Sequence, residues 1–211
     1  MTRNFITFEG GEGSGKTTII QRLAERLKEN NYDVVTTREP GGVKIAEQIR
    51  EVILNKDNQA MDGRTEALLY AAARRQHLVE TVIPHLRAGK VVLCDRFIDS
   101  SLAYQGYARG LGVDEVMAVN AFAIDHWMPS LTLFLDIEPE KGLERIQQNE
   151  TREINRLDLE HITFHHKVYE GYKALVETNK DRIQVVQAEQ SIEAVERDAF
   201  NIILSHIQRK N

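Results

Sequence analysis

The sequence predicts an α/β protein in which helices cover both faces of a doubly wound, five-stranded parallel sheet. Three observations support this fold class. Short apolar runs alternate with longer segments of helical periodicity, a glycine-rich loop separates the first apolar run from the first helical segment, and no repeat or long linker interrupts the 211 residues. We therefore expect residues 1–211 to form a single domain.

Five short apolar runs are the expected strands. They cover residues 4–8, 33–37, 90–94, 131–136 and 183–186. Continuous apolar runs of this length are typical of strands that are buried on both faces of a parallel sheet. The polar residues that follow each run are then expected at one edge, because ligands bind such sheets at the carboxyl ends of the strands.

Helical periodicity predicts the elements between the strands. One helix begins near Lys16, and others are expected over 43–54, 64–88, 113–127, 138–148, 159–178 and 191–208, with short helical pieces between 99 and 112. The longest, 64–88, has an apolar stripe made of Leu68, Leu69, Ala72, Leu78, Val79 and Val82. Pro84 is expected to kink its end and Gly89 to stop it.

Composition excludes several classes of protein. The net charge of −5 argues against general nucleic-acid binding, which requires a basic surface. Cys94, the one cysteine, lies in an apolar run and is expected to be an inert core thiol. We see neither a secretory signal nor an apolar run of about 18 residues, so we expect no membrane span and a cytoplasmic protein.

The first loop fits the phosphate-binding pattern G-x-x-x-x-G-K-[ST] from Gly10 to Thr17. Glycines allow its backbone to curl and to direct N–H groups at a phosphate, and the helix that follows adds the positive end of its dipole. Lys16 is expected to contact the β- and γ-phosphates, and the Thr17 hydroxyl to ligate Mg²⁺. A glycine-rich turn that binds nothing is disfavoured, because every fixed position and both flanking elements match.

Two more segments follow directly after predicted strands, at the same edge of the predicted sheet. Loop 38–42 contains one proline and two glycines, and Asp95 and Arg96 follow the run 90–94 directly. Asp95 could hold a Mg²⁺-bound water or accept a proton, or it could cap the next turn. Arg96 could bind a phosphate through two parallel hydrogen bonds, or it could form a surface ion pair.

Two polar pairs have the spacing of one helical turn. Tyr70 and Arg74 share a helix face, where a ring could stack on a base and a guanidinium could bond to the base edge. The same spacing would arise if Tyr70 only lay at the edge of the core and Arg74 only on the solvated face of the helix. Ser101 and Gln105 form a second pair if that stretch is helical, with Tyr104 beside them.

A charged segment, about 149–158, is expected to be a lid. Its Arg152 and Arg156 could neutralise charge on a phosphate during transfer, although a solvated loop would have the same composition. His165 and His166 follow on the next helix. Since no cysteine or acidic residue lies at metal-ligand spacing from them, we interpret them as surface histidines rather than a zinc site.

Taken together, these segments resemble bacterial thymidylate kinases, which are P-loop nucleoside monophosphate kinases. The residues that carry the resemblance are 8–17, 37–42, 95–97, 100–106 and the arginine-bearing lid 152–158. The resemblance implies transfer of a phosphoryl group from ATP to dTMP, giving dTDP and ADP for dTTP synthesis. It also implies Mg²⁺ as cofactor and a homodimer, with no nucleic acid or membrane as partner.

The resemblance assigns roles to individual residues. The ATP-binding residues are Gly10, Gly11, Glu12, Gly13, Ser14, Gly15, Lys16, Thr17 and Thr18, and Thr17 and Asp95 bind the metal. The dTMP-binding residues are Glu39, Arg50, Tyr70, Arg74, Arg96, Ser101, Tyr104 and Gln105. The catalytic residues are Lys16, Asp95, Arg96, Arg152 and Arg156. Gly13 occupies the position where eukaryotic relatives have an arginine, so an arginine of the lid is expected to take over the role of that loop arginine.

Within the dTMP site the resemblance is more specific. Arg50 would hold the acceptor phosphate, Arg96 would bridge the two substrates, and Glu39 would contact the sugar or a metal-bound water. Tyr70 would stack on thymine while Arg74 and Gln105 bond to its edge. Tyr104 would crowd the sugar 2′ position and thereby disfavour ribonucleotides.

Two other classes of protein share parts of this pattern. A GTPase switch is rejected, because Asn179-Lys180-Asp181 lacks the fourth residue of N-K-x-D and no Asp-x-x-Gly occurs. A kinase of another acceptor, such as deoxyguanosine or dUMP, would share the fold and differ only in the pocket.

Overall fold

The computed structural model describes residues 2–148 and 156–208. Its sheet has five strands in the order β2-β3-β1-β4-β5, and every pair is parallel. The strands are β1 Phe5–Glu9, β2 Val34–Arg38, β3 Val91–Asp95, β4 Leu131–Asp136 and β5 Ile183–Gln187. The predicted doubly wound α/β fold is confirmed, and each strand lies within one residue of its expected bounds.

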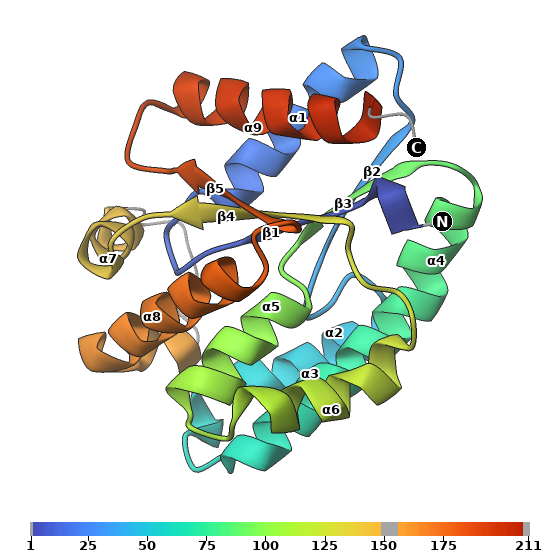
Figure 1. The fold of residues 1–211 in the computed structure, drawn as a ribbon. Helices are drawn as coiled ribbons and strands as arrows, with labels where there is room; N and C mark the ends of the chain where they lie inside the picture. The colour runs from blue at the N-terminus through green and yellow to red at the C-terminus, as the bar shows by residue number, and fades with distance from the viewer. Residues whose placement is uncertain (1, 149–155, 209–211) are drawn as a thin grey trace.

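Helices cover both faces of this sheet, as Figure 1 shows. On one face lie α1 Lys16–Glu29 and α9 Ile192–Gln208; the other carries α2 Lys44–Leu54, α3 Gly63–His77, α4 Ile83–Arg87, α5 Ile98–Ser101, α6 Val113–Ile124 and α8 Ile162–Thr178, while α7 Pro139–Gln147 follows β4. Two apolar clusters fill the two layers. Cys94 is fully buried in one of them, and burial raises the pKa of its thiol, as expected of an inert core cysteine.

The predicted helix 64–88 is interrupted. It consists of α3, a π-helical turn at Leu78–Val82 and α4, and Pro84 lies in the first turn of α4 rather than at a kinked end. Proline has no N–H to give to the preceding turn, which accounts for the widened turn before it. Gly89 ends the helix as predicted, with a φ of +79°.

The predicted apolar stripe of this helix is partly wrong. Leu68, Ala72 and Val79 point outward, and Leu68 is 58% exposed. The face of α3 that packs inward instead carries alanines together with the polar residues Glu66 and Arg74, which are 1% exposed each. Hydrophobic periodicity was wrong within α3, because this helix directs charged groups toward a cavity and leaves Leu68 at the surface; Leu78 and Val82, in the turn that follows, are buried as predicted.

The other boundaries differ by a few residues. The predicted helices 113–127 and 159–178 are α6 and α8, and the latter begins later because a 3₁₀ turn, Arg156–Leu159, precedes it. The helical pieces expected after residue 99 are α5 and a π-helical turn at Leu102–Ala108. Within the described ranges, every helix is too short or too polar to span a bilayer.

Parallel register brings three strand ends together. Asp95 is opposite Phe8 on one side of β3 and opposite Arg38 on the other. The chain leaves β1 into the glycine-rich loop, β2 into the Pro40 loop and β3 into Arg96. The three predicted site segments therefore meet at the carboxyl edge of the sheet.

Candidate active site

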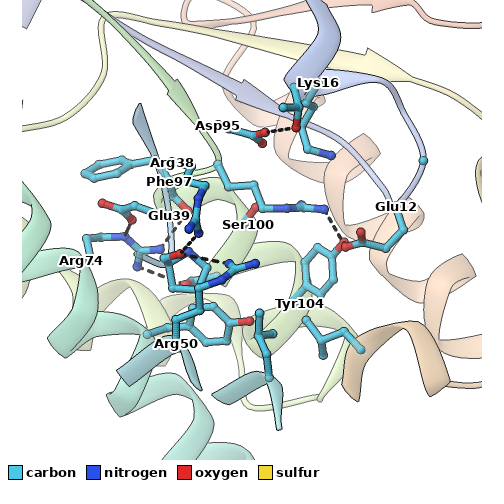
Figure 2. A pocket seen from close by; sticks show the side chains of 18 of the residues that line it. Glu12, Lys16, Arg38, Glu39, Arg50, Arg74, Asp95, Phe97, Ser100 and Tyr104 are labelled. Carbon is cyan, nitrogen blue, oxygen red and sulfur yellow. Dashed lines mark hydrogen bonds and ion pairs between the residues drawn. The ribbon is translucent and has the colours of Figure 1, made fainter. Parts of the chain in front are cut away.

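A cavity of about 510 Å³ lies at this edge of the sheet (Figure 2). Its lining includes all the residues predicted to bind dTMP, and most of those predicted to bind phosphate. Polar side chains dominate this lining, among them Glu12, Lys16, Thr17, Arg38, Glu39, Arg50, Tyr70, Arg74, Asp95, Arg96, Ser101, Tyr104, Gln105 and Arg145. A cavity of this size at the carboxyl ends of parallel strands is large enough for a small ligand.

The glycine-rich loop curls around the Lys16 ammonium. Gly10, Gly13 and Gly15 have φ values of +146°, +72° and +86°, which residues with a Cβ rarely adopt. Lys16 Nζ donates to the carbonyl oxygens of Gly10 and Gly11 at 3.1 and 3.0 Å. Burial and the nearby charge of Arg96 lower the pKa of Lys16 to about 8. The loop thus holds a desolvated cation at the start of α1.

Gly13 also has a steric role. A Cβ at this position would lie 1.9 Å from the carbonyl oxygen of Gly142 on α7. A side chain would therefore force the loop away from α7, so the arginine that eukaryotic relatives carry at this position does not fit here.

The two residues predicted to bind metal lie side by side. Thr17 Oγ1 donates to Asp95 Oδ2 at 2.9 Å, and Figure 2 shows Asp95 beside Lys16 at the top of the cavity. A hydroxyl and a carboxylate are the oxygen ligands that Mg²⁺ uses together with phosphate and water. Within the described residues no cluster of three His, Cys, Asp or Glu side chains could hold a metal by itself.

Arg96 lies at the centre of the cavity wall. Its backbone is left-handed, with a φ of +68°, and its amide donates to Phe8 O. Its guanidinium donates to Gly10 O at 2.9 Å and to Glu12 Oε1 at 2.7 Å. These contacts fix a cation, whose side chain is 16% exposed, between the glycine-rich loop and the rest of the cavity.

Glu9, which sequence reasoning missed, supports Arg96 from behind. This fully buried carboxylate accepts from Phe97 N at 2.7 Å, Ser100 Oγ at 2.6 Å and Tyr172 Oη at 2.8 Å. Both hydroxyls also lie within 3.2 Å of Arg96 Nη1. Burial and the charge of Asp99 raise the pKa of Glu9 to about 7. Only its place in the Phe-Glu-Gly segment could have indicated a role, because its partners lie far away in sequence.

A buried ion pair joins Glu39 to Arg74. Arg74 Nε donates to Glu39 Oε2 at 2.8 Å, and His77 Nδ1 lies 2.8 Å from Glu39 Oε1. Arg74 also donates to Ser101 Oγ at 3.1 Å, to Asn120 Oδ1 and to Phe97 O at 3.0 Å. Most of the hydrogen-bonding capacity of Arg74 is therefore used within the protein, more than the sequence suggested.

The remaining predicted dTMP residues surround the same space. Tyr70 and Arg50 line it from α3 and α2, and Arg50 Nη1 donates to Pro40 O at 3.1 Å. Tyr104 Oη donates to Glu12 Oε1 at 3.0 Å, so the Glu12 side chain faces this part of the cavity. Gln105 lines the cavity and donates through Nε2 to Glu66 Oε1 at 2.9 Å.

Arg156 lies elsewhere than expected. Its Nε donates to Ile53 O at 2.8 Å and its Nη2 donates to Glu66, and its side chain is 4% exposed. It is absent from the lining of the described cavity, and its contact with a phosphate stays a prediction. The other lid arginine, Arg152, lies outside the described residues. Arg38 and Arg145, which were not predicted as site residues, do line the cavity.

The two histidines of α8 differ from each other. His165 was expected at the surface, but it is 5% exposed and borders a small second cavity together with Gly11 and Glu12 of the glycine-rich loop. Burial lowers its pKa. His166 is 43% exposed and pairs with Glu140 at 2.8 Å, as a surface residue does.

A doubly wound sheet with a phosphate-binding loop and a cationic cavity at its carboxyl edge defines the class of P-loop nucleoside monophosphate kinases. Comparisons with known proteins identify the family. The model of the thymidylate kinase family matches residues 8–199. The chain belongs to the thymidylate kinase family.

Individual relatives support this assignment. A thymidylate kinase of Oceanobacillus iheyensis is 62% identical over 206 residues, which are 98% of this chain and 92% of the relative. One of Clostridium novyi is 65% identical over 191 residues, covering 90% of this chain and 93% of the relative. The crystal structure of thymidylate kinase from Ehrlichia chaffeensis superposes with a TM-score of 0.75 at 33% identity, covering 95% of this chain and 97% of that one.

Proposed function

We propose that this chain transfers the γ-phosphoryl group of ATP to dTMP in the described cavity and releases dTDP and ADP. Membership of the thymidylate kinase family supports the reaction. The observation that carries the assignment of the site is that one cavity is lined by both the glycine-rich loop and the predicted dTMP residues. Phosphoryl transfer needs positioning and charge neutralisation more than covalent chemistry by the protein.

The donor half of the site would hold the ATP phosphates. Lys16 and the N–H groups at the start of α1 would bind them, and Thr17 and Asp95 would hold Mg²⁺. These two side chains fit the metal, because their oxygens lie 2.9 Å apart beside the loop. When bound, Mg²⁺ would neutralise charge on the donor phosphates.

The acceptor half would hold dTMP. Arg50 and Arg96 would bind its phosphate, and the hydrogen bonds of Arg96 to Gly10 and Glu12 favour a fixed guanidinium over a mobile one. Tyr70 would stack on the base, while Arg74 and Gln105 would bond to its edge. Tyr104, which Glu12 holds by its hydroxyl, would lie against the sugar.

The lid arginine would be Arg152, since Arg156 pairs with Glu66.

Residues 1–211 would form one domain. The described cavity already draws on elements from α1 to the turn before α8, which supports a single unit.

We also propose a homodimer that packs through α2, α3 and α6. Figure 1 shows α3 beside α2 and α6, and each of the three helices exposes large apolar side chains. On these helices they are Ile45, Val52, Leu68 and Phe122, of which Phe122 is 93% exposed; Val79 lies just beyond α3, in the π-helical turn that follows it. Burying such side chains against a second copy would remove apolar surface from water.

A panel of acceptors tests the proposed reaction. The purified protein is mixed with ATP, Mg²⁺ and one acceptor at a time: dTMP, dUMP, dGMP or deoxyguanosine. We expect dTDP to form with the highest kcat/KM. Absence of dTDP where another acceptor is consumed would contradict the proposal and favour a kinase of that acceptor.

A further inference from the structure

Glu66 is the centre of a buried polar cluster that touches the cavity at one residue. It lies in the first turn of α3 and is 1% exposed. Its Oε1 accepts from Gln105 Nε2 at 2.9 Å and from Arg109 Nε at 3.3 Å. Its Oε2 accepts from Arg109 Nη2 at 3.3 Å and from Arg156 Nη2. Gln105 is the member of this cluster that lines the cavity.

The hydrogen-bond donors around Glu66 keep its carboxylate ionised. Burial alone would raise the pKa of Glu66, but the charge of Arg109 and the hydrogen bonds from Arg156 and Gln105 outweigh it and hold that pKa below its ordinary value. An ionised carboxylate only accepts hydrogen bonds. Two arginines therefore maintain an acceptor-only group directly behind the Gln105 amide.

The orientation of the Gln105 amide follows from this. A glutamine amide has a donor side, its NH₂ group, and an acceptor side, its carbonyl oxygen. Because Glu66 can only accept, the NH₂ group must face Glu66, which leaves the carbonyl oxygen for the cavity. With the opposite orientation two oxygens would face each other in a buried place, at a cost of a lost hydrogen bond and an unsatisfied acceptor.

We propose that Glu66 is a specificity-determining residue, which fixes the Gln105 carbonyl oxygen toward the base and thereby selects a ring that donates at N3. This inference rests on the proposed function, because it takes Gln105 as a reader of the base. Thymine carries a hydrogen on N3, whereas the N3 of cytosine is an acceptor. A base that places an acceptor opposite the Gln105 carbonyl oxygen is rejected far more strongly than a base that differs only slightly in shape.

The substitution Glu66→Gln tests this orientation. Arg109 Nη2 and Arg156 Nη2 both donate to Oε2, so the carbonyl oxygen of a glutamine at this position would face them. Its NH₂ group would then replace Oε1, lose the 3.3 Å contact with Arg109 Nε, face Gln105 and turn that amide over. We expect the ratio of kcat/KM for dTMP to kcat/KM for dCMP to fall by at least about tenfold, mainly through a higher KM for dTMP. The KM for ATP should stay within about twofold, since Glu66 lies outside the donor half.

Three variants separate selectivity from stability. Asp99→Asn removes another buried carboxylate, which pairs with Arg182 at 2.6 Å, and it should lower the melting temperature without changing the dTMP:dCMP ratio. Gln105→Leu should lower the ratio by itself. Adding Glu66→Gln to Gln105→Leu should then change the ratio no further, because the reader through which Glu66 acts is gone.

The outcomes distinguish this inference from the proposed function. A wild-type protein that forms no dTDP overturns the proposed function and this inference with it. A wild-type protein that prefers dTMP, together with a Glu66→Gln protein of unchanged ratio, overturns this inference alone. If Glu66→Gln does not fold, Glu66→Asp serves instead: its shorter side chain cannot reach Gln105 and both arginines together, so the ratio should again fall, and an unchanged ratio would overturn the inference.

Discussion

Arg74 Nε lies 2.8 Å from Glu39 Oε2, and the two side chains are 2% and 3% exposed. This ion pair connects α3 with the loop after β2. His77 strengthens the connection, since its ring lies between Glu39 Oε1 and Thr37 Oγ1 at 2.8 and 2.6 Å. Helix α3, which carries the proposed base readers Tyr70 and Arg74, and the loop after β2 therefore share one buried contact, and disturbing either partner should affect both elements.

Replacing Arg74 by alanine should weaken dTMP binding and leave ATP binding nearly intact. It should also lower the free energy of unfolding by about 3–5 kcal/mol, because Glu39 would stay buried without its charged partner. Calorimetric titration with each nucleotide and thermal unfolding measure the two effects. Arg75→Ala, an exposed neighbour on the same helix, is the matched control. Equal loss of affinity for both nucleotides would contradict the base-reading role.

Replacing Lys16 by methionine should lower kcat by at least about 10²-fold, as loss of a preorganised charge at a reacting phosphate does. Methionine keeps the length of the side chain and removes its charge and its hydrogen bonds to Gly10 and Gly11. Lys28→Met on the exposed end of α1 controls for the loss of a lysine. Near-normal turnover of the Lys16→Met protein, measured as dTDP formed per second, would exclude Lys16 from catalysis.

ATP affinity should fall as the pH rises through the pKa of Lys16, which burial lowers to about 8. The protonated form binds phosphate and predominates below that pH; phosphate groups, with a second pKa of about 6, have already lost their protons there. Bound ATP should raise the pKa of Lys16, so binding near pH 8 should take up protons.

Titration calorimetry in two buffers of different ionisation enthalpy measures this uptake. The uptake should disappear in Lys16→Met. Equal affinity one pH unit below and one above this pKa would show that Lys16 keeps its proton throughout.

Local patterns predicted the parts of this fold that depend on neighbours in sequence. The apolar run 131–136 matches β4 residue by residue, because the whole strand is buried. The glycine-rich loop was equally predictable, since its spacing alone determines how its backbone curls. The roles predicted for the dTMP residues came from resemblance. Helical spacing paired Ser101 with Gln105, but it does not distinguish them from residues of a core helix.

Contacts between distant residues could not be predicted in this way. Arg156 was assigned to the lid from its charge, but Glu66, 90 residues away in sequence, holds it. Tyr172 and Glu9 meet across 163 residues. His165 was expected at the surface because no metal partner was near, whereas it lies on the side of α8 that is buried together with Val168 and Tyr172.

Replacing Asp95 by asparagine should raise the Mg²⁺ concentration needed for half-maximal activity and lower kcat by at least about tenfold. The amide keeps the shape of the side chain but lacks the charge that a hard cation prefers. Thr17→Ser should retain Mg²⁺ dependence, because it retains the hydroxyl, while Thr17→Val should lose it. Asp33→Asn, at an exposed ion pair with Lys90, is the control. An unchanged Mg²⁺ titration of the Asp95→Asn protein would remove Asp95 from the metal site.

Replacing Phe122 by glutamate should convert the proposed dimer into monomers. Phe122 is 93% exposed, so a charge costs the single chain little, whereas burying that charge against a second copy would be strongly unfavourable. Sedimentation equilibrium at several concentrations measures the change, and the melting temperature of the monomer should fall if the dimer stabilises the fold. Ile192→Glu places the same charge on a partly exposed apolar position at the start of α9, in the opposite layer, and should leave the dimer intact. A wild-type protein that is monomeric at every concentration, or a Phe122→Glu protein that dimerises as strongly as wild type, would exclude this face as the interface.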